Sequence, residues 1–209
     1  VLLAYCKKYF AGAQIQSAYE AGFCGFHLHR CLEAEGIKNL VVDPAGMEVA
    51  VGNRVKTDKR DSLKLATHLA GGRLKGIHVP SVEREDYRAV TRLRETFSRQ
   101  RSRFACQLKS LLFQHGLIQA DDKKKVSEKW IKVLETMPVC PGRKYAIGNY
   151  IAQWRQMDAK IKEIEKELAV QAQKDGNIEA IYRSVPGVGP ISARVLANEV
   201  EDTLQFSNE

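Results

Sequence analysis

The sequence lacks several features that would place the protein in a specialised class. No stretch of its 209 residues approaches the roughly 18 uninterrupted apolar residues of a membrane-spanning helix. Its five cysteines are scattered and contain no Cys-x-x-Cys pair, which argues against a disulfide framework or a zinc site. The first charged side chains, Lys7 and Lys8, follow a short apolar run instead of preceding it, so the N-terminus does not have the pattern of a signal peptide. These absences predict a cytoplasmic protein with no membrane association.

The sequence does have the balance of a folded globular protein with an excess of positive charge. Hydrophobic residues make up 44% of the chain and charged residues 28%, which is too apolar for a disordered chain. The formal net charge is +8. Because each Lys or Arg set against a phosphate releases a counterion, such a chain favours a polyanionic partner. Net charge alone does not identify that partner, so the distribution of charge along the chain carries more information.

Alternating strand and helix signals occupy the first third of the chain. Residues 13–19 alternate apolar and polar side chains and run into Glu20, and residues 23–34 have helical spacing before Gly36. The apolar run Ile37–Val42 has the composition of a buried parallel strand. This β-α-β order predicts two parallel strands joined by a right-handed crossover.

Two further elements complete the predicted α/β unit, residues 1–80. Asp58 has the sequence context of a helix N-cap, and the helix that it begins is expected to end at Gly71-Gly72. Residues 74–79, which end before Pro80, suit one more short strand.

Long helices dominate the next region, residues 81–176. We expect helices from Ser81 to about His115, from Val126 to Thr136, and from about Tyr145 to Lys174. The third helix has a heptad seam whose apolar residues alternate in spacing between three and four: Ile147, Tyr150, Trp154, Met157, Ile161, Ile164 and Leu168. Such a seam packs along another helix, either the Ser81–His115 helix or the copy in a partner chain, and the sequence does not choose between them.

The last region, residues 177–209, contains a glycine-rich turn between two short helical segments. Residues 178–185 and 191–200 flank the sequence Pro186-Gly187-Val188-Gly189-Pro190, an arrangement that resembles a helix-hairpin-helix. Backbone N–H groups around Gly187 and Gly189 are able to bind a DNA phosphate, as the N-termini of helices do. A plain tight turn explains the glycines equally well.

Three acidic residues in the α/β unit are candidates for catalysis and metal binding. Asp58 and Asp61 are three residues apart at a helix start, so their Cβ atoms lie about 5–6 Å apart on one face. Two like charges that close favour a hard cation between them, and Mg²⁺ suits carboxylate ligands. Glu20 follows a strand, at the edge of the sheet where α/β folds bind ligands. Each also has a structural explanation, namely helix capping for the aspartates and an ordinary turn carboxylate for Glu20.

Basic residues form the third candidate feature. Arg84, Arg88 and Arg92 are one helical turn apart and form a stripe that is able to follow a phosphate backbone, although a solvated face is the alternative. The other nucleic-acid-binding candidates outside the glycine turn are Lys56, Arg60, Arg99 and Arg103.

Several motifs resemble a known family when they are taken in order. They are Tyr19-Glu20-Ala21-Gly22-Phe23, Leu28-His29-Arg30, Val41-Val42-Asp43-Pro44-Ala45, Val55-Lys56-Thr57-Asp58-Lys59-Arg60-Asp61, His78-Val79-Pro80, and the distal Ser184-Val185-Pro186-Gly187-Val188-Gly189-Pro190 with Phe206-Ser207. In this order and spacing the chain resembles the DEDD transposases of bacterial insertion sequences, over nearly its whole length.

The resemblance implies a fold, a chemistry and a set of partners. The implied fold is an α/β RNase H-like (RuvC-like) domain that lacks its first strands, then a long-helix or coiled-coil region, then the start of a C-terminal transposase domain. The implied reaction is metal-dependent DNA cleavage and strand transfer with Mg²⁺ (or Mn²⁺), in which Glu20, Asp58 and Asp61 match the family's second, third and fourth acids. The implied partners are DNA, a structured guide RNA and further copies of the chain through the long helices, in the bacterial cytoplasm.

Two parts of the family pattern have no match in the chain. The first acid would lie upstream of Val1 and the family's serine nucleophile beyond Glu209, so we interpret the chain as cut at both ends and expect it not to run the complete reaction alone. Two other functions stay open: a non-catalytic DNA- or RNA-binding module that uses the basic helices, and a coiled-coil dimerisation protein. Metal dependence tests the first alternative and a measurement of molecular size tests the second.

Overall fold

The computed structural model describes residues 2–43, 57–119 and 124–201, and Lys56, Pro44-Ala45 and Phe206-Ser207 lie outside them. The chain divides into two compact units, Val1–Val79 (the N-terminal unit) and Pro80–Glu209 (the C-terminal unit). The segments 81–176 and 177–209, which the sequence analysis treats separately, fall within one unit. Each unit is described by itself.

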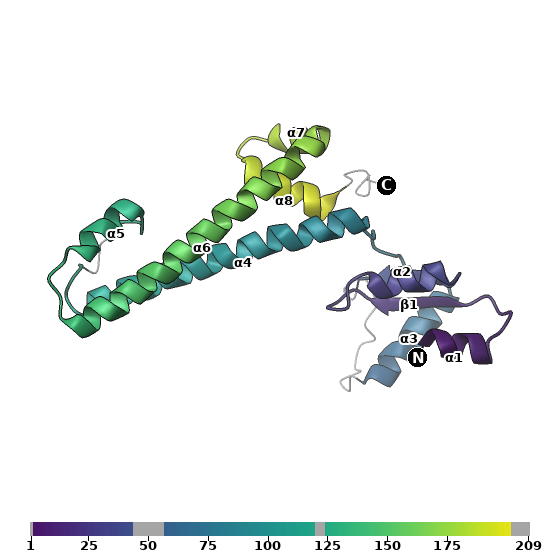
Figure 1. Ribbon diagram of the computed structural model, residues 1–209. Helices are drawn as coiled ribbons and strands as arrows, with labels where there is room; N and C mark the ends of the chain where they lie inside the picture. Colours follow the sequence, from purple (N-terminus) through teal and green to yellow (C-terminus); the bar gives the residue numbers. More distant parts are fainter. Residues whose placement is uncertain (1, 44–56, 120–123, 202–209) are drawn as a thin grey trace. The chain divides into compact units, whose positions relative to one another are not determined.

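A two-stranded parallel sheet lies at the centre of the N-terminal unit (Figure 1). Strand β1 (Gln16–Glu20) pairs with β2 (Lys38–Val42), and Glu20 stands opposite Val42 in the register. Helix α2 (His27–Ala34) connects the strands, so the predicted β-α-β order and parallel pairing are confirmed. Among the residues of this unit that the structure describes, the buried hydrophobic core consists of Leu32, Ile37, Val41 and Val42. Two strands do not establish an RNase H-like fold, which stays a prediction.

Helices α1 (Leu2–Tyr9) and α3 (Asp58–Ala70) complete the N-terminal unit, and α3 packs against β1. Thr57, not Asp58, is the N-cap of α3: its carbonyl accepts hydrogen bonds from the N–H groups of Arg60 and Asp61, and Asp58 is the first helical residue. The prediction of Asp58 as the cap is therefore wrong by one position, because threonine and aspartate are both good capping residues and the sequence places them side by side.

The chain after α3 meets the sheet at a single point. Gly76 forms an isolated antiparallel bridge with Val42, and the N–H of Ile77 donates to the carbonyl of Val41 at 2.8 Å. The strand predicted over residues 74–79 is therefore wrong. Glycine in a strand has no side chain to pack. A Cβ at position 76 would lie 3.2 Å from Leu40 Cδ2, so the absence of a side chain allows the backbone of Gly76 to lie close to Leu40. This suits a single close contact with β2 rather than an extended strand pairing.

Two long helices, α4 (Val82–Gln114) and α6 (Pro141–Lys174), run side by side along the C-terminal unit (Figure 1). Helix α5 (Glu128–Glu135) lies near one end of this pair, and α7 (Gly176–Arg183) and α8 (Pro190–Val200) lie at the other end. No helix in the described ranges is long and apolar enough to cross a membrane.

The heptad seam of α6 packs against α4 of the same chain. Its buried members include Ile147, Trp154, Ile161 and Leu168, and the first two join a cluster with Leu108 and Leu112 of α4 and with Ile131 and Leu134 of α5. Full burial of an aliphatic side chain stabilises the fold by about 1.5–3 kcal/mol. Of the two packing partners left open by the sequence, the structure shows the Ser81–His115 helix.

Ser81, the N-cap of α4, makes two kinds of contact. Its hydroxyl accepts a hydrogen bond from the N–H of Arg84 at 3.2 Å, which confirms the predicted helix start. The same hydroxyl donates to Glu201 Oε1 at 2.9 Å, and the N–H of Ser81 donates to Glu201 Oε2 at 3.4 Å. The first and last described residues of this unit's helical part therefore lie next to each other.

Candidate functional site

The candidate acid Glu20 ends β1 at the carboxyl edge of the sheet, as the sequence analysis expects. Its side chain is half-buried, and the next residue, Ala21, donates its N–H to the carbonyl of Val42 at 2.8 Å. The backbone pairing of the two strands therefore continues one residue past Glu20. This pairing fixes the backbone that carries the carboxylate.

Asp58 and Asp61 lie in the first turn of α3, at the positive end of the helix dipole. Asp58 is exposed and Asp61 is half-buried. Near the other end of the helix, Leu69 lines a small cavity together with Gln16 and Lys38, the first residues of the two strands. The C-terminal end of α3 thus lies at the amino edge of the sheet, and the two aspartates lie at the opposite end of the helix.

The structure does not gather the three acids into one cluster. In the described part of the chain, no group of three or more His, Cys, Asp or Glu side chains is placed to hold a metal ion. Asp58 and Asp61 are neighbours, but Glu20 does not join them in such a group. Mg²⁺ is commonly held by one or two carboxylates, with water and phosphate oxygens as the other ligands, so the neighbouring pair Asp58 and Asp61 is compatible with such a site but does not establish one. The catalytic and metal-binding roles of the three acids stay predictions.

A polar network between α2 and the two strands gives His29, of the Leu28-His29-Arg30 motif, a structural role. Asn39 of β2 is only 3% exposed, and its side-chain amide donates to Ser17 Oγ of β1 at 2.8 Å. The opposite atom, Asn39 Oδ1, lies 2.9 Å from His29 Nδ1 of α2, and since an amide oxygen only accepts, the ring nitrogen donates. Glu33 adds a contact by accepting from the N–H of Asn39 at 2.6 Å. No local sequence pattern predicts this link between α2 and the two strands.

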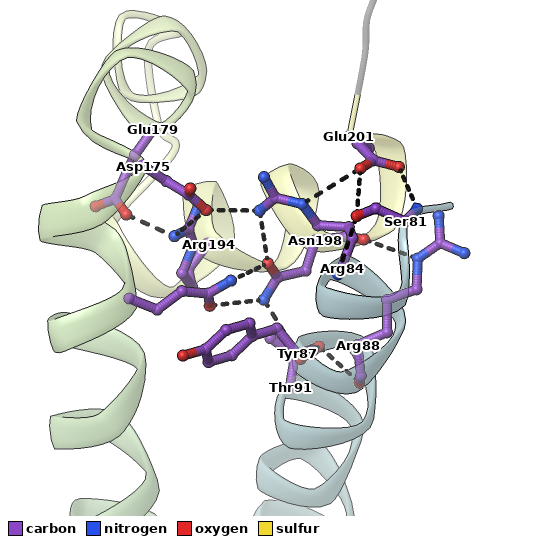
Figure 2. A network of polar contacts seen from close by, with 11 residues as sticks. Ser81, Arg84, Tyr87, Arg88, Thr91, Asp175, Glu179, Arg194, Asn198 and Glu201 are labelled. Atoms are coloured by element: carbon purple, nitrogen blue, oxygen red, sulfur yellow. Dashed lines mark hydrogen bonds and ion pairs between the residues drawn. The ribbon is translucent and has the colours of Figure 1, made fainter. Parts of the chain in front are cut away.

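Arg84 and Arg88 of the predicted stripe point into the C-terminal unit (Figure 2). Arg84 Nη1 donates to Asp175 Oδ2 at 2.6 Å and to Asn198 Oδ1 at 3.2 Å. Arg88 donates through Nε and Nη2 to the carbonyls of Asn198 and Glu199, both at 2.7 Å. The two side chains are 11% and 14% exposed. Both side chains bind α8, and Arg88 pairs with carbonyls that the end of a helix leaves without a partner. This geometry does not support a phosphate-binding stripe at these two positions.

The other basic candidates on α4 lie at the surface. The Arg92 side chain is 67% exposed, and its Nε and Nη2 each lie 2.9 Å from a carboxylate oxygen of Glu199. These hydrogen bonds raise the pKa of Arg92 above its usual value, against the smaller opposing effect of burial. Arg99 is 77% exposed and pairs with Glu95 one turn earlier. Arg103, and Arg60 of α3, are exposed as well.

A family model described as transposase, for DEDD enzymes of the IS110 type, matches residues 2–116. The chain belongs to the DEDD transposase family. The matched span contains Glu20, Asp58 and Asp61 and all of α4. The resemblance found in the sequence is therefore confirmed.

Transposases of several bacterial insertion sequences are similar to this chain. It is 30% identical to y4rJ of Sinorhizobium fredii, a candidate transposase by its name, over 92% of this chain and 53% of that protein. It is 27% identical to the transposase for insertion sequence element IS1533 of Leptospira borgpetersenii, over 93% of this chain and 58% of that protein. The transposase for IS1111A of Coxiella burnetii is 24% identical, over 86% and 50%. The chain spans about half the length of these relatives.

The glycine turn of the C-terminal unit connects α7 to α8, which pack against each other. Gly187 has φ +86°, a conformation that glycine adopts without strain, and Gly189 is the N-cap of α8. Pro190 follows at the first helical position, where its missing N–H costs nothing. The predicted pair of helices is present, and the role of Gly187 and Gly189 in binding nucleic acid stays a prediction.

A buried polar network around α8 was not predicted from the sequence (Figure 2). Arg194 is 1% exposed, and its Nη1 donates to Asp175 Oδ2 at 3.1 Å, while its Nε lies 3.7 Å from Glu179 Oε2. Gln171 and Asn198 are also buried. One signal was available, since Gln171 stands three residues after Leu168 and so continues the heptad seam with a polar residue.

Proposed function

We propose that this protein acts in the DNA cleavage and strand transfer of a bacterial insertion sequence, in a reaction that depends on Mg²⁺ (or Mn²⁺). The match of the DEDD transposase family over residues 2–116 carries this proposal, because that span includes all three candidate acids. The excess of basic residues supports a polyanionic substrate.

Asp58 and Asp61 are the proposed centre of the metal site, and Glu20 is the proposed third acid. Divalent ions bound by such carboxylates stabilise the attacking and leaving oxygens of a phosphodiester. Two aspartates on one turn of α3 supply only part of a coordination sphere. Glu20 is the proposed further ligand from the protein, and water and phosphate oxygens would supply the rest.

The proposed partners are DNA, a structured guide RNA and a second copy of the chain. Arg60, Arg92, Arg99 and Arg103 are the exposed members of the predicted nucleic-acid surface, together with the turn at Gly187 and Gly189. Lys56, a further candidate, lies outside the described residues. Because the heptad seam is occupied by α4, a dimer through the long helices would have to use exposed apolar residues such as Leu93 and Val170.

A pair of matched carboxylate variants tests the proposed metal site. Mn²⁺ binding is measured by electron paramagnetic resonance, and DNA binding is measured with Mg²⁺ and after its removal by a chelator. Asp61→Asn should weaken Mn²⁺ binding and remove the effect of Mg²⁺ on DNA binding. Asp86→Asn, which changes an exposed carboxylate of α4, should behave as the wild type. Wild-type behaviour of Asp61→Asn would reject the metal site and favour a non-catalytic nucleic-acid-binding module.

A further inference from the structure

A groove of about 590 Å³ lies in the C-terminal unit between α4, α6 and the segment that leads into α5. Five basic side chains line it: Arg101, Lys109, Lys124, Lys125 and Lys162. The lining contains two acidic side chains, Asp158 and Glu128, which leaves three positive charges in excess. None of the five is among the individual residues named above as nucleic-acid-binding candidates, and two of them, Arg101 and Lys109, lie on the same basic helix as those candidates.

Both acids of the groove are already engaged by cations. Asp158 accepts hydrogen bonds from Arg101 and from Lys162, the latter at 2.8 Å. Burial alone would raise the pKa of Asp158, but these hydrogen bonds outweigh it and hold the pKa below its usual value. Glu128 is paired with Arg155 at 2.9 Å. Neither carboxylate is therefore left to repel an anion that enters the groove.

Trp154 and Ser127 also line the groove. The Trp154 side chain belongs to the hydrophobic cluster between the long helices, and the guanidinium of Arg101 lies 6.0 Å from its ring centroid. This cation–π contact and the bond to Asp158 hold Arg101 at the groove from two sides. Ser127, the N-cap of α5, also lines the groove, so the positive end of that helix dipole adds to the charge of the side chains.

We propose that this groove binds a phosphodiester segment of a nucleic acid. The inference rests on the proposed function, which supplies a nucleic acid as the ligand. Cations on several sides of one concave surface fit a chain of phosphates, because each phosphate contact releases counterions without requiring a base sequence. A groove of this volume is the size of a small-molecule pocket, which favours a single strand over a whole duplex. DNA and RNA share this chemistry, so the experiment separates them.

Cys106 provides a direct measurement, because it lines the groove and is exposed. The whole chain is treated with N-ethylmaleimide, with and without saturating single-stranded DNA, single-stranded RNA or duplex DNA, and the alkylation of each cysteine is followed by mass spectrometry. A bound strand should slow the alkylation of Cys106 severalfold. Cys24 and Cys140, which are exposed and do not line the groove, serve as internal controls. Equal rates at Cys106 with and without a strand that binds would overturn the inference.

A matched pair of double variants gives an independent test. Lys125→Gln/Lys162→Gln removes two charges from the groove, and Lys144→Gln/Lys166→Gln removes two exposed lysines of α6 that do not line it. The groove variant should weaken single-strand binding and reduce the slope of log K against log salt by about 0.7 for each phosphate that the protein no longer neutralises. Equal slopes in the two variants would place the bound strand elsewhere and leave the proposed function intact. If the wild type binds none of the three nucleic acids, the inference and the proposed function both fail.

Discussion

Gln171 and Asn198 exchange two side-chain hydrogen bonds in the interior of the C-terminal unit. Gln171 Nε2 donates to Asn198 Oδ1 at 2.8 Å, and Asn198 Nδ2 donates to Gln171 Oε1 at 3.1 Å. The two residues are 3% and 0% exposed, so water is not available to replace either bond. This pair joins α6 to α8, and Arg84 of α4 adds a third helix by donating to the same Asn198 oxygen. The three helices are therefore held by polar contacts whose removal is costly.

Asn198→Ala should destabilise the C-terminal unit by about 1–3 kcal/mol, because it leaves the buried Gln171 amide without a partner. Chemical denaturation followed by circular dichroism measures the change. Asn149→Ala, which removes an exposed amide of α6, is the control and should change the free energy of unfolding by less than about 0.5 kcal/mol. Equal effects of the two substitutions would contradict the role assigned to the buried pair.

Arg88→Ala should also destabilise the protein by about 1–3 kcal/mol, because the carbonyls of Asn198 and Glu199 lose a charged donor in a partly buried place. Arg99→Ala removes only an exposed pair with Glu95, and we expect a decrease of no more than about 0.5 kcal/mol. Thermal denaturation compares the two. A stable Arg88→Ala variant that binds DNA with a reduced salt slope would restore the phosphate-binding role predicted from the sequence.

Asn39→Ala should loosen the N-terminal unit, because it breaks the connection from His29 of α2 to Ser17 of β1. Hydrogen exchange by mass spectrometry should show faster exchange in β1 and β2, with little change in α4 and α6. The C-terminal unit acts as an internal reference, since the two units are separate compact bodies. Faster exchange in both units alike would show a general loss of stability instead.

Acid should weaken the C-terminal unit through Asp158. Burial opposes the ionisation of this carboxyl, but the hydrogen bonds from Lys162 and Arg101 outweigh burial and lower its pKa. Its contribution to stability is therefore present above the unfolded pKa of about 4 and is lost as the pH falls through the folded value. Asp158→Asn should lower stability at neutral pH and flatten the decline at acid pH. Unfolding midpoints from neutral to acid pH measure this, and a decline as steep as in the wild type would contradict it.

Local patterns predicted the elements of this protein better than its long-range contacts. The alternation of apolar and polar residues before Glu20 and the apolar run after Gly36 predicted the two parallel strands. The heptad spacing predicted the buried face of α6. Ser81 was identified as a helix start because a capping side chain acts within one turn. The strand over residues 74–79 failed because a short apolar run does not show whether a partner strand accepts it.

The arginines show the limit of sequence reasoning on the candidate site. Arg84 and Arg88 bind residues more than 90 positions later in the chain, and no spacing rule reaches that far. A helical stripe of charge therefore looks the same in sequence whether it faces solvent, a phosphate backbone or the end of another helix. The groove around Arg101 was missed for a related reason, because its cations come from three separate segments. The sequence predicted that Asp58 and Asp61 lie on one helical turn, because their spacing is local. The distance from this pair to Glu20 depends on tertiary structure, which no local spacing predicts.

The contact between Ser81 and Glu201 has a consequence for how the helical part of the protein can vary. Glu201 adopts φ 59° and ψ −75°, a strained backbone for a residue with a side chain, and its carboxylate is held there by Ser81. The residue before α4 and the residue after α8 are therefore in contact. Because α6 packs on α4 through a seven-residue repeat, a change in length that keeps this packing would add or remove seven residues in both helices together. The contact between Ser81 and Glu201 does not itself fix the length of the pair of long helices.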